Sequence, residues 1–262
     1  MISVLANVDR SHVVHEPYPH LVIPNALPDA EYRELEANFP SPEQFKRTLK
    51  YACRQTDDNK SLKRGLRHLR RSNRRVNLSS RWVVDQPEVA ERWRQFIDYH
   101  SSPEFYQQLS AIFAEALAHY HPALMEKNLP SARRGQLQSE GISLDALTAI
   151  NTPARRRGEI TGPHTDHPSK LFIGLYYFQI PGDEGGGDLV LYRRREAVNE
   201  KNLKWPKPDT VEAVRTVSYA PNTLVILLNS PQSVHGVTLR DKSPFPRRFV
   251  NFVAEYKQAK LG

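Results

Sequence analysis

Hydrophobic positions recur at helical spacing in the first half of the chain. Residues 29–39 carry an apolar stripe and begin after a proline, and Pro40 and Pro42 are expected to end this helix. Two further helices are predicted, over residues 87–99 and, after a Ser-Ser-Pro-Glu start signal, over residues 103–117. The first half of the chain is therefore expected to be mainly helical.

Beyond residue 140 the pattern changes to short β-rich runs that glycine and proline interrupt. Strands are expected at residues 20–23, ahead of the first helix, and at residues 146–151, 170–178, 188–192, 214–219, 223–228, 234–239 and 247–256. Many short strands without helices between them favour a sandwich, barrel or jelly roll over a parallel α/β sheet.

Composition narrows the class of protein. The chain has 262 residues, a mean hydropathy of −0.60 and a single cysteine, Cys53, which excludes an internal disulfide framework and a cysteine-based zinc cluster. No apolar run is long enough to cross a bilayer, and the first residues do not resemble a secretory signal. These features predict a cytoplasmic protein that does not bind membranes, and they leave its oligomeric state open.

The chain is basic, with 37 Lys and Arg against 29 Asp and Glu, a formal net charge of +8. Residues 60–75 hold eight basic residues and no acidic residue. Such an excess would attract an anionic metabolite, an acidic carrier protein or nucleic acid, although the absence of interleaved aromatic residues gives nucleic acid little support. A solvated surface helix or a mobile loop is an equally simple interpretation of this segment.

Three side chains in the β-rich half form a candidate metal site. His164 and Asp166 are two residues apart, so in an extended strand both project from the same face. If the later strand that begins near His235 faces them, the three supply two imidazoles and one carboxylate. This set leaves three positions of an octahedron open and suits non-haem Fe(II).

Other interpretations of these residues stay open. A zinc hydrolase can use the same ligands, although the chain lacks the helical histidine pair of the zincins. The chain has ten histidines, so ordinary surface histidines are a second alternative.

The order of motifs from about residue 144 to residue 256 resembles that of the Fe(II)- and 2-oxoglutarate-dependent oxygenases, in particular their prolyl-hydroxylase-like branch. The matching elements are the His-Thr-Asp triplet, a strand ending in Tyr-Tyr-Phe, a glycine-rich hairpin, Gly187-Asp188-Leu189, Pro221-Asn222-Thr223, His235, and arginine on the last strand. The resemblance implies an α+β, mainly β fold: a double-stranded β-helix, or jelly roll, with helices packed on one sheet. We expect a single domain over residues 1–262, with a mostly helical buttress and a leading strand in residues 1–140 and the catalytic core in residues 141–257.

The resemblance also implies roles for individual residues. His164, Asp166 and His235 would bind Fe(II), with 2-oxoglutarate and O₂ as cosubstrates. Arg247 or Arg248 would bind the C5 carboxylate of 2-oxoglutarate; only one of these neighbours can point inward, and Arg247 is slightly favoured. Tyr177 and Asn151 align with further positions that line the 2-oxoglutarate site in the family.

The implied activity is hydroxylation of a C–H bond with release of succinate and CO₂, because Asp166 occupies the position where halogenating relatives have a small residue. The substrate is not specified by the sequence and could be anionic or carrier-bound. Lys170 and Arg240 flank the predicted site, and solvation at the surface is the simplest interpretation of both. A cupin-like binding protein without turnover and a metal-dependent hydrolase remain alternative functions.

Overall fold

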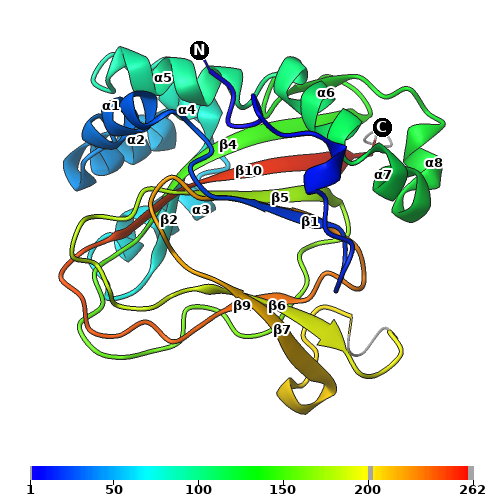
Figure 1. Ribbon diagram of the computed structural model, residues 1–262. Coiled ribbons are helices and arrows are strands. Elements are labelled where there is room, and N and C mark those ends of the chain that lie inside the picture. The colour runs from blue at the N-terminus through cyan, green and yellow to red at the C-terminus, as the bar shows by residue number, and fades with distance from the viewer. Residues whose placement is uncertain (1, 200–202, 259–262) are drawn as a thin grey trace.

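Two β-sheets face each other in the computed structural model, which describes residues 2–199 and 203–258 (Figure 1). The strand order in the larger sheet is β1 (His20–Ile23), β8 (Leu224–Leu228), β5 (Lys170–Tyr177), β10 (Arg247–Lys257), β4 (Gly141–Asn151), β2 (Arg75–Leu78). These strands pair antiparallel, and β3 (Ser131–Arg133) pairs with β4 in parallel. The smaller sheet has the order β7 (Val211–Val217), β6 (Leu189–Arg194), β9 (His235–Val237).

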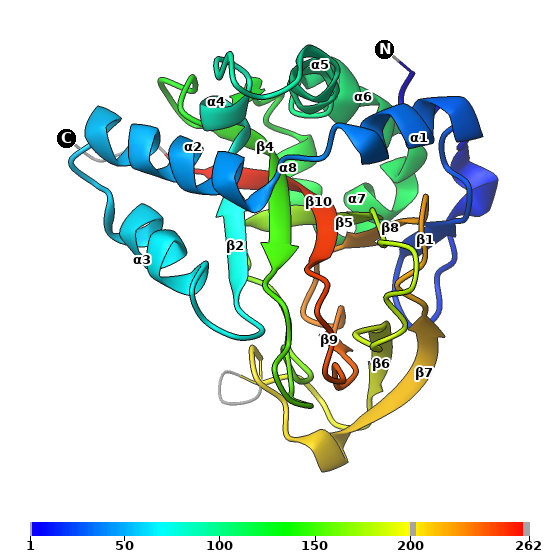
Figure 2. The same cartoon turned by 90° about the vertical axis from the view of Figure 1, so that its left-hand side faces the viewer.

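Helices cover the outer face of the larger sheet, and the smaller sheet lies on the opposite side (Figures 1 and 2). They are α1 (Asp29–Ala37), α2 (Pro42–Gln55), α3 (Lys60–His68), α4 (Ser80–Val83), α5 (Glu91–Tyr99), α6 (Pro103–Ile112), α7 (Ala114–Tyr120) and α8 (Pro122–Met125), with short 3-10 turns at Arg10–His12 and Pro208–Thr210. Helix α3 lies beside β2, at the edge of the sheet (Figure 2). Among the described residues, no helix combines the length and the apolar character that a membrane crossing requires.

The larger sheet buries side chains on both faces, which divides the apolar interior into two cores. On the helix side, Trp93 and Phe96 of α5 pack around Phe178, at ring-centroid distances of 5.2 and 6.5 Å. On the other side, Tyr177 and Phe249 pack with residues of the smaller sheet. Because successive residues of a strand point to opposite faces, β5 and β10 contribute to both cores. This arrangement confirms the predicted fold class, a mainly β architecture of two facing sheets with helices on one of them.

Helix α2 was not predicted, because Pro40 and Pro42 were interpreted as the end of the preceding helix. Pro42 instead occupies the first turn of α2. The Ser41 hydroxyl accepts a hydrogen bond from the Gln44 backbone N–H (3.3 Å), and the Gln44 side chain accepts one from the Ser41 N–H (2.8 Å). This reciprocal capping box is readable in the sequence Ser-Pro-Glu-Gln and starts a helix rather than ending one.

The basic segment also differs from expectation in part. Residues 60–68 form a helix, one of the two alternatives considered, and Arg75–Leu78 form the unpredicted edge strand β2. Only Val76 and Leu78 of this strand are buried, so its apolar alternation is too short to predict a strand against the charged sequence around it. The predicted helix over residues 103–117 is divided at Phe113 into α6 and α7.

His100, at the end of α5, ties the N-terminal segment to the helical core. It is 2% exposed, its Nδ1 lies 2.8 Å from the Phe96 carbonyl oxygen, and its Nε2 accepts a hydrogen bond from the Val4 N–H at 3.1 Å. Nδ1 must therefore carry the ring proton while Nε2 remains a neutral acceptor. Burial lowers the pKa of His100 to about 3, against the opposing effect of the Phe96 carbonyl.

We expect His100 to make folding stability depend on pH between about 6.5 and 3. In this range the unfolded chain protonates the histidine while the folded protein does not, so the free energy of unfolding falls as the pH falls. The His100→Gln variant keeps a donor and an acceptor without titrating. Between pH 6.5 and 5, wild type should lose about 2 kcal/mol more stability than the variant in urea unfolding. Parallel losses in the two proteins would contradict this assignment.

Candidate metal centre

His164 and His235 meet because their backbones pair. The His164 N–H donates to the His235 carbonyl oxygen and the His235 N–H donates to the His164 carbonyl oxygen, both at 2.9 Å. Directly opposed residues of an antiparallel pair project to the same side, and here the imidazole centroids lie 4.5 Å apart. Asp166 follows two residues after His164. Ligand atoms of all three residues lie within 4.8 Å of one another, so the structure brings together the predicted metal-binding set.

Backbone carbonyls determine which nitrogen of each imidazole is free. His164 Nδ1 lies 2.9 Å from the Gly162 carbonyl oxygen, and His235 Nδ1 lies 3.0 Å from the Ser233 carbonyl oxygen. In each ring Nδ1 must then carry the proton, which leaves the Nε2 lone pair available to a metal ion. Hydrogen bonds of this kind fix the tautomer and ring orientation of histidine ligands in metalloproteins.

The site also favours the protonation states that metal binding requires. Burial and the neighbouring His235 lower the pKa of His164 to about 4, so this imidazole is neutral near pH 7. Burial alone would raise the pKa of Asp166, but the neighbouring His235 and the charge of Lys170 hold it well below its ordinary value. A neutral imidazole and an ionised carboxylate are ready ligands.

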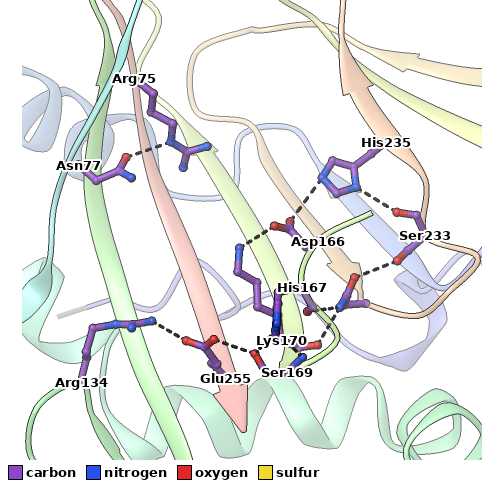
Figure 3. Close-up of polar contacts among 11 residues, drawn as sticks. Arg75, Asn77, Arg134, Asp166, His167, Ser169, Lys170, Ser233, His235 and Glu255 are labelled. Carbon is purple, nitrogen blue, oxygen red and sulfur yellow. Dashed lines mark hydrogen bonds and ion pairs between the residues drawn. The ribbon is translucent and has the colours of Figure 1, made fainter. Parts of the chain in front are cut away.

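Asp166 is oriented by a lysine, which Figure 3 shows reaching from the start of β5. Lys170 Nζ lies 2.7 Å from Asp166 Oδ1, and Asp166 Oδ2 lies 3.5 Å from His235 Nε2. The lysine thus occupies one carboxylate oxygen and leaves the other facing the imidazoles. The expectation that Lys170 is simply solvated is wrong, because its side chain is one quarter exposed and paired with a ligand.

Asn229 joins the two segments that carry the candidate ligands. Its amide nitrogen donates to the carbonyl oxygens of His167 (3.0 Å) and Lys170 (2.9 Å), while its oxygen accepts from the Ser233 hydroxyl (3.2 Å). Ser233 in turn provides the carbonyl that orients His235. Nothing in the sequence around Asn229, which was interpreted as a turn residue, marked this bridging role.

Trp205 shields His164 from one side. The two rings stack at a centroid distance of 5.3 Å, and Trp205 remains 58% exposed. The backbone next to it is fixed to the metal-binding loop, because Thr165 donates to the carbonyl oxygens of Leu203 (2.8 Å) and Lys204 (3.0 Å). Contacts between such distant segments were not predictable from spacing along the chain.

The register of the larger sheet aligns polar residues beside this centre. Arg75 of β2 and Arg247 of β10 both lie opposite Asn151 of β4, and Phe249 lies opposite Tyr177 of β5. Cross-strand partners share a face, so all five project toward the smaller sheet. Arg75 is close enough to Asp166 and Arg247 for both charges to act on it. Desolvation lowers the pKa of Arg75 to about 10. The negative charge of Asp166 opposes this shift, and the positive charge of Arg247 adds to it.

Arg247 is a buried cation with unused hydrogen-bonding capacity. It is 3% exposed, and its Nε and Nη2 have no hydrogen-bond partner among the described residues, nor have Tyr177 Oη and Asn151 Oδ1. Its Cζ lies 4.9 Å from the Tyr177 ring centroid and 4.5 Å from that of Tyr219. Gly187 lies next to it, and a Cβ there would be in ordinary van der Waals contact with Arg247 Cδ and Nε, at 3.4 Å. A buried guanidinium in this state is costly unless an anion pairs with it.

The two adjacent arginines differ completely in environment. Arg248 points to the helix side of the sheet, where its Nε donates to the Phe178 carbonyl oxygen (3.0 Å) and its Nη2 lies 3.6 Å from Glu36. Of the two candidates for binding 2-oxoglutarate, only Arg247 therefore faces the interior that the metal-binding set adjoins.

Arg240 is not the solvated surface residue that we expected. It is fully buried and pairs with Asp183, with Nη2 and Oδ2 3.0 Å apart. Its position holds together the loops after β5 and β9 rather than lining the site. His167 faces away from the metal-binding set and bonds to Ser169 at 2.7 Å, consistent with its exclusion as a ligand.

Solved structures similar to this one include prolyl hydroxylases. A Pseudomonas putida prolyl-4-hydroxylase is 15% identical, with 91% of this chain and 92% of that chain covered at a TM-score of 0.41. A Trichoplax adhaerens prolyl hydroxylase, solved with a hypoxia inducible factor peptide, is 10% identical, with 90% and 83% covered at a TM-score of 0.41. The non-heme alpha-ketoglutarate-dependent epimerase SnoN from nogalamycin biosynthesis is also 10% identical, with 90% and 78% covered at 0.45.

No protein-family model matches the chain, and no curated protein is significantly similar to it.

We expect one equivalent of Co(II), used as an oxygen-stable probe, to bind at the metal centre. Replacing His164 or His235 with alanine removes one of three protein ligands, so the Co(II) affinity should fall by at least about 100-fold. Visible absorption titration measures both values. His167→Ala is the matched control, because His167 lies next to the centre without facing it, and this variant should bind as wild type does. Unchanged Co(II) affinity in the His235→Ala variant would contradict the site.

Proposed function

We propose that this protein is an Fe(II)- and 2-oxoglutarate-dependent dioxygenase that hydroxylates a C–H bond of its substrate. The observation that carries the proposal is the buried Arg247, whose unused N–H groups face the interior beside a two-histidine, one-carboxylate set. The sequence motifs that resemble this family support the same conclusion. The overall reaction converts substrate, 2-oxoglutarate and O₂ into hydroxylated substrate, succinate and CO₂.

The ligand set fits Fe(II). Two imidazoles and a carboxylate can occupy one face of an octahedron, which leaves three positions for a bidentate keto acid and O₂. When bound, iron with 2-oxoglutarate supplies the electrons that activate O₂ for attack on a C–H bond. Lys170 holds one oxygen of Asp166 and leaves the other available, which favours ligation through a single oxygen.

The residues around Arg247 fit the distal carboxylate of 2-oxoglutarate. A guanidinium can bind a carboxylate through two parallel hydrogen bonds, and Arg247 has two nitrogens free to do so. Burial raises the pKa of Tyr177 while the positive charge of Arg247 opposes the rise, so the phenol stays protonated and can donate to the same carboxylate. Asn151, opposite Arg247 in the sheet, supplies a further polar group.

Apolar side chains of both sheets exclude water from this interior. Phe249 and Tyr219 pack against the guanidinium, and Leu189 and Leu191 of the smaller sheet close the same core. A dry site strengthens the arginine–carboxylate pair and limits side reactions of the bound cosubstrates. The chain's own residues therefore bind and orient the keto acid, hold the metal and exclude solvent.

The alternatives account for less of the site. A metal-dependent hydrolase could use the same three ligands, but it has no need for an unpaired buried arginine beside them. A cupin-like binding protein would tolerate loss of a ligand, whereas this chain retains the complete set.

We expect 2-oxoglutarate to bind to the Fe(II) protein without O₂ and to produce a visible charge-transfer band. The Arg247→Gln variant loses the charged partner of the carboxylate, so its dissociation constant for 2-oxoglutarate should rise about 100-fold. Arg248→Gln is the matched control, since the neighbouring arginine faces the helices, and its 2-oxoglutarate affinity should be that of wild type.

Catalysis is tested by succinate release. The Fe(II) protein should form succinate from 2-oxoglutarate only when O₂ is present. At limiting 2-oxoglutarate, the Arg247→Gln variant should release succinate more slowly than wild type. Hydrolytic activity with zinc and no requirement for O₂ would contradict the proposal, as would an absent charge-transfer band in wild type.

A further inference from the structure

A cavity lies at the β2 edge of the larger sheet. It has a volume of about 610 Å³, within the usual range for small-molecule sites, and α3, β2, α4 and β4 contribute its walls. His164, Asp166 and His235 are not among its lining residues, so it is distinct from the metal centre. Leu62, Val76, Trp82 and Leu147 give it apolar walls.

The polar lining of this cavity carries an excess of positive charge. Four arginines line it, Arg64, Arg75, Arg81 and Arg134, against the two acids Asp58 and Asp145.

The carboxylate of Asp145 already has hydrogen-bond and ion-pair partners within the protein. It accepts hydrogen bonds from Ser79 and Ser80 at 2.8 Å and pairs with Arg134 at 2.7 Å. Arg134 also pairs with Glu255 at 3.0 Å, and Figure 3 shows this pair at the foot of the sheet. Arg134 is therefore shared between two carboxylates, and neither carboxylate pairs with Arg64, Arg75 or Arg81.

Arg64, Arg75 and Arg81 form no ion pair with a carboxylate in the part of the chain that the structure describes. Arg81 is held in place by the ring of Trp82, whose centroid lies 4.0 Å from its Cζ. Arg75 Nε donates to Asn77 at 3.0 Å, and its Cζ lies 4.8 Å from the Phe249 centroid. Two of the three are thus positioned before any ligand arrives.

Arg75 links the cavity to the metal centre. It lines the cavity, and it stands in one row with Asn151 and Arg247 across β2, β4 and β10. Figure 3 shows its side chain and that of Asn77 on the side of the sheet where Asp166 and His235 lie. An anionic group in the cavity would therefore bind at one end of a continuous face whose other end adjoins the metal.

We propose that this cavity binds a phosphate or carboxylate group of the substrate and so directs the substrate's oxidisable carbon toward the metal centre. The orientation of the substrate toward the metal rests on the proposed dioxygenase function. Anion binding in the cavity does not depend on that function. Guanidinium groups pair with both anions through charge-assisted hydrogen bonds, and the apolar walls would pack against the organic part of the molecule.

The test is isothermal titration calorimetry on the metal-free protein at low ionic strength, with pyrophosphate in one arm and tricarballylate in the other. We expect saturable binding of at least one probe, and the tighter one identifies a phosphate-bearing or a carboxylate-bearing substrate. Each of the variants Arg64→Gln and Arg75→Gln should raise its dissociation constant about tenfold. Because no iron or 2-oxoglutarate is present, the result does not depend on the dioxygenase proposal.

Two control variants locate the binding. Arg67 is an exposed residue of the same helix, α3, and does not line the cavity, so Arg67→Gln should bind the probe as wild type does. Arg247→Gln should also retain the probe, which shows that the anion is not in the 2-oxoglutarate site. Absence of saturable binding, equal weakening by Arg64→Gln and Arg67→Gln, or loss of binding only in Arg247→Gln would each overturn the proposal.

Discussion

The backbone pairing of His164 with His235 is the constraint on which the candidate site depends. Two hydrogen bonds of 2.9 Å fix these residues opposite each other, although they come from segments far apart in the sequence. A slip of one residue in this pairing would turn one imidazole to the other face and separate the ligands. Asn229 and the Ser233 carbonyl maintain the register from one side, and the Gly162 carbonyl orients His164 from the other. The candidate metal centre therefore depends on pairing between two distant segments of the chain.

The larger sheet connects this centre to charged groups that the protein does not neutralise itself. Arg247 is buried among aromatic rings, and Arg75 lies in the same row at the sheet edge. Burying a guanidinium without a carboxylate is unfavourable, and such residues are commonly found where an anion binds. One uncompensated cation beside the candidate metal centre and several in the adjacent cavity are the basis on which we propose binding of an anionic keto acid and an anionic substrate.

Much of the fold could be predicted because its central strands are long, apolar and bounded by turn residues. The first strand was placed at residues 20–23, as observed, and the predicted strands at residues 170–178 and 247–256 differ from β5 and β10 by one residue at the C-terminal end. Strand β2 was missed because two buried residues are too few to reveal a strand in a basic segment. The cavity could not be predicted for the same reason, since it exists only where β2 and α3 meet the sheet.

The sequence predicted which residues belong to the candidate site more readily than it predicted the direction in which their side chains point. The His-Thr-Asp triplet indicated two ligands through the alternation of a strand, and the distal histidine followed from the motif order. Alternation also implied that only one of Arg247 and Arg248 points inward, but selecting it required knowledge of which face the helices cover. Arg240 was wrongly expected to be solvated, because no local sequence pattern indicates that it pairs with the buried Asp183.

The most direct test of the central claim is a crystal structure of the protein grown without O₂ in the presence of Mn(II) and 2-oxoglutarate. We expect the metal to be bound by Nε2 of His164, Nε2 of His235 and one oxygen of Asp166, with the distal carboxylate of 2-oxoglutarate paired to Arg247. A metal bound elsewhere, or an Arg247 that remains without an anionic partner while 2-oxoglutarate occupies another site, would contradict the account.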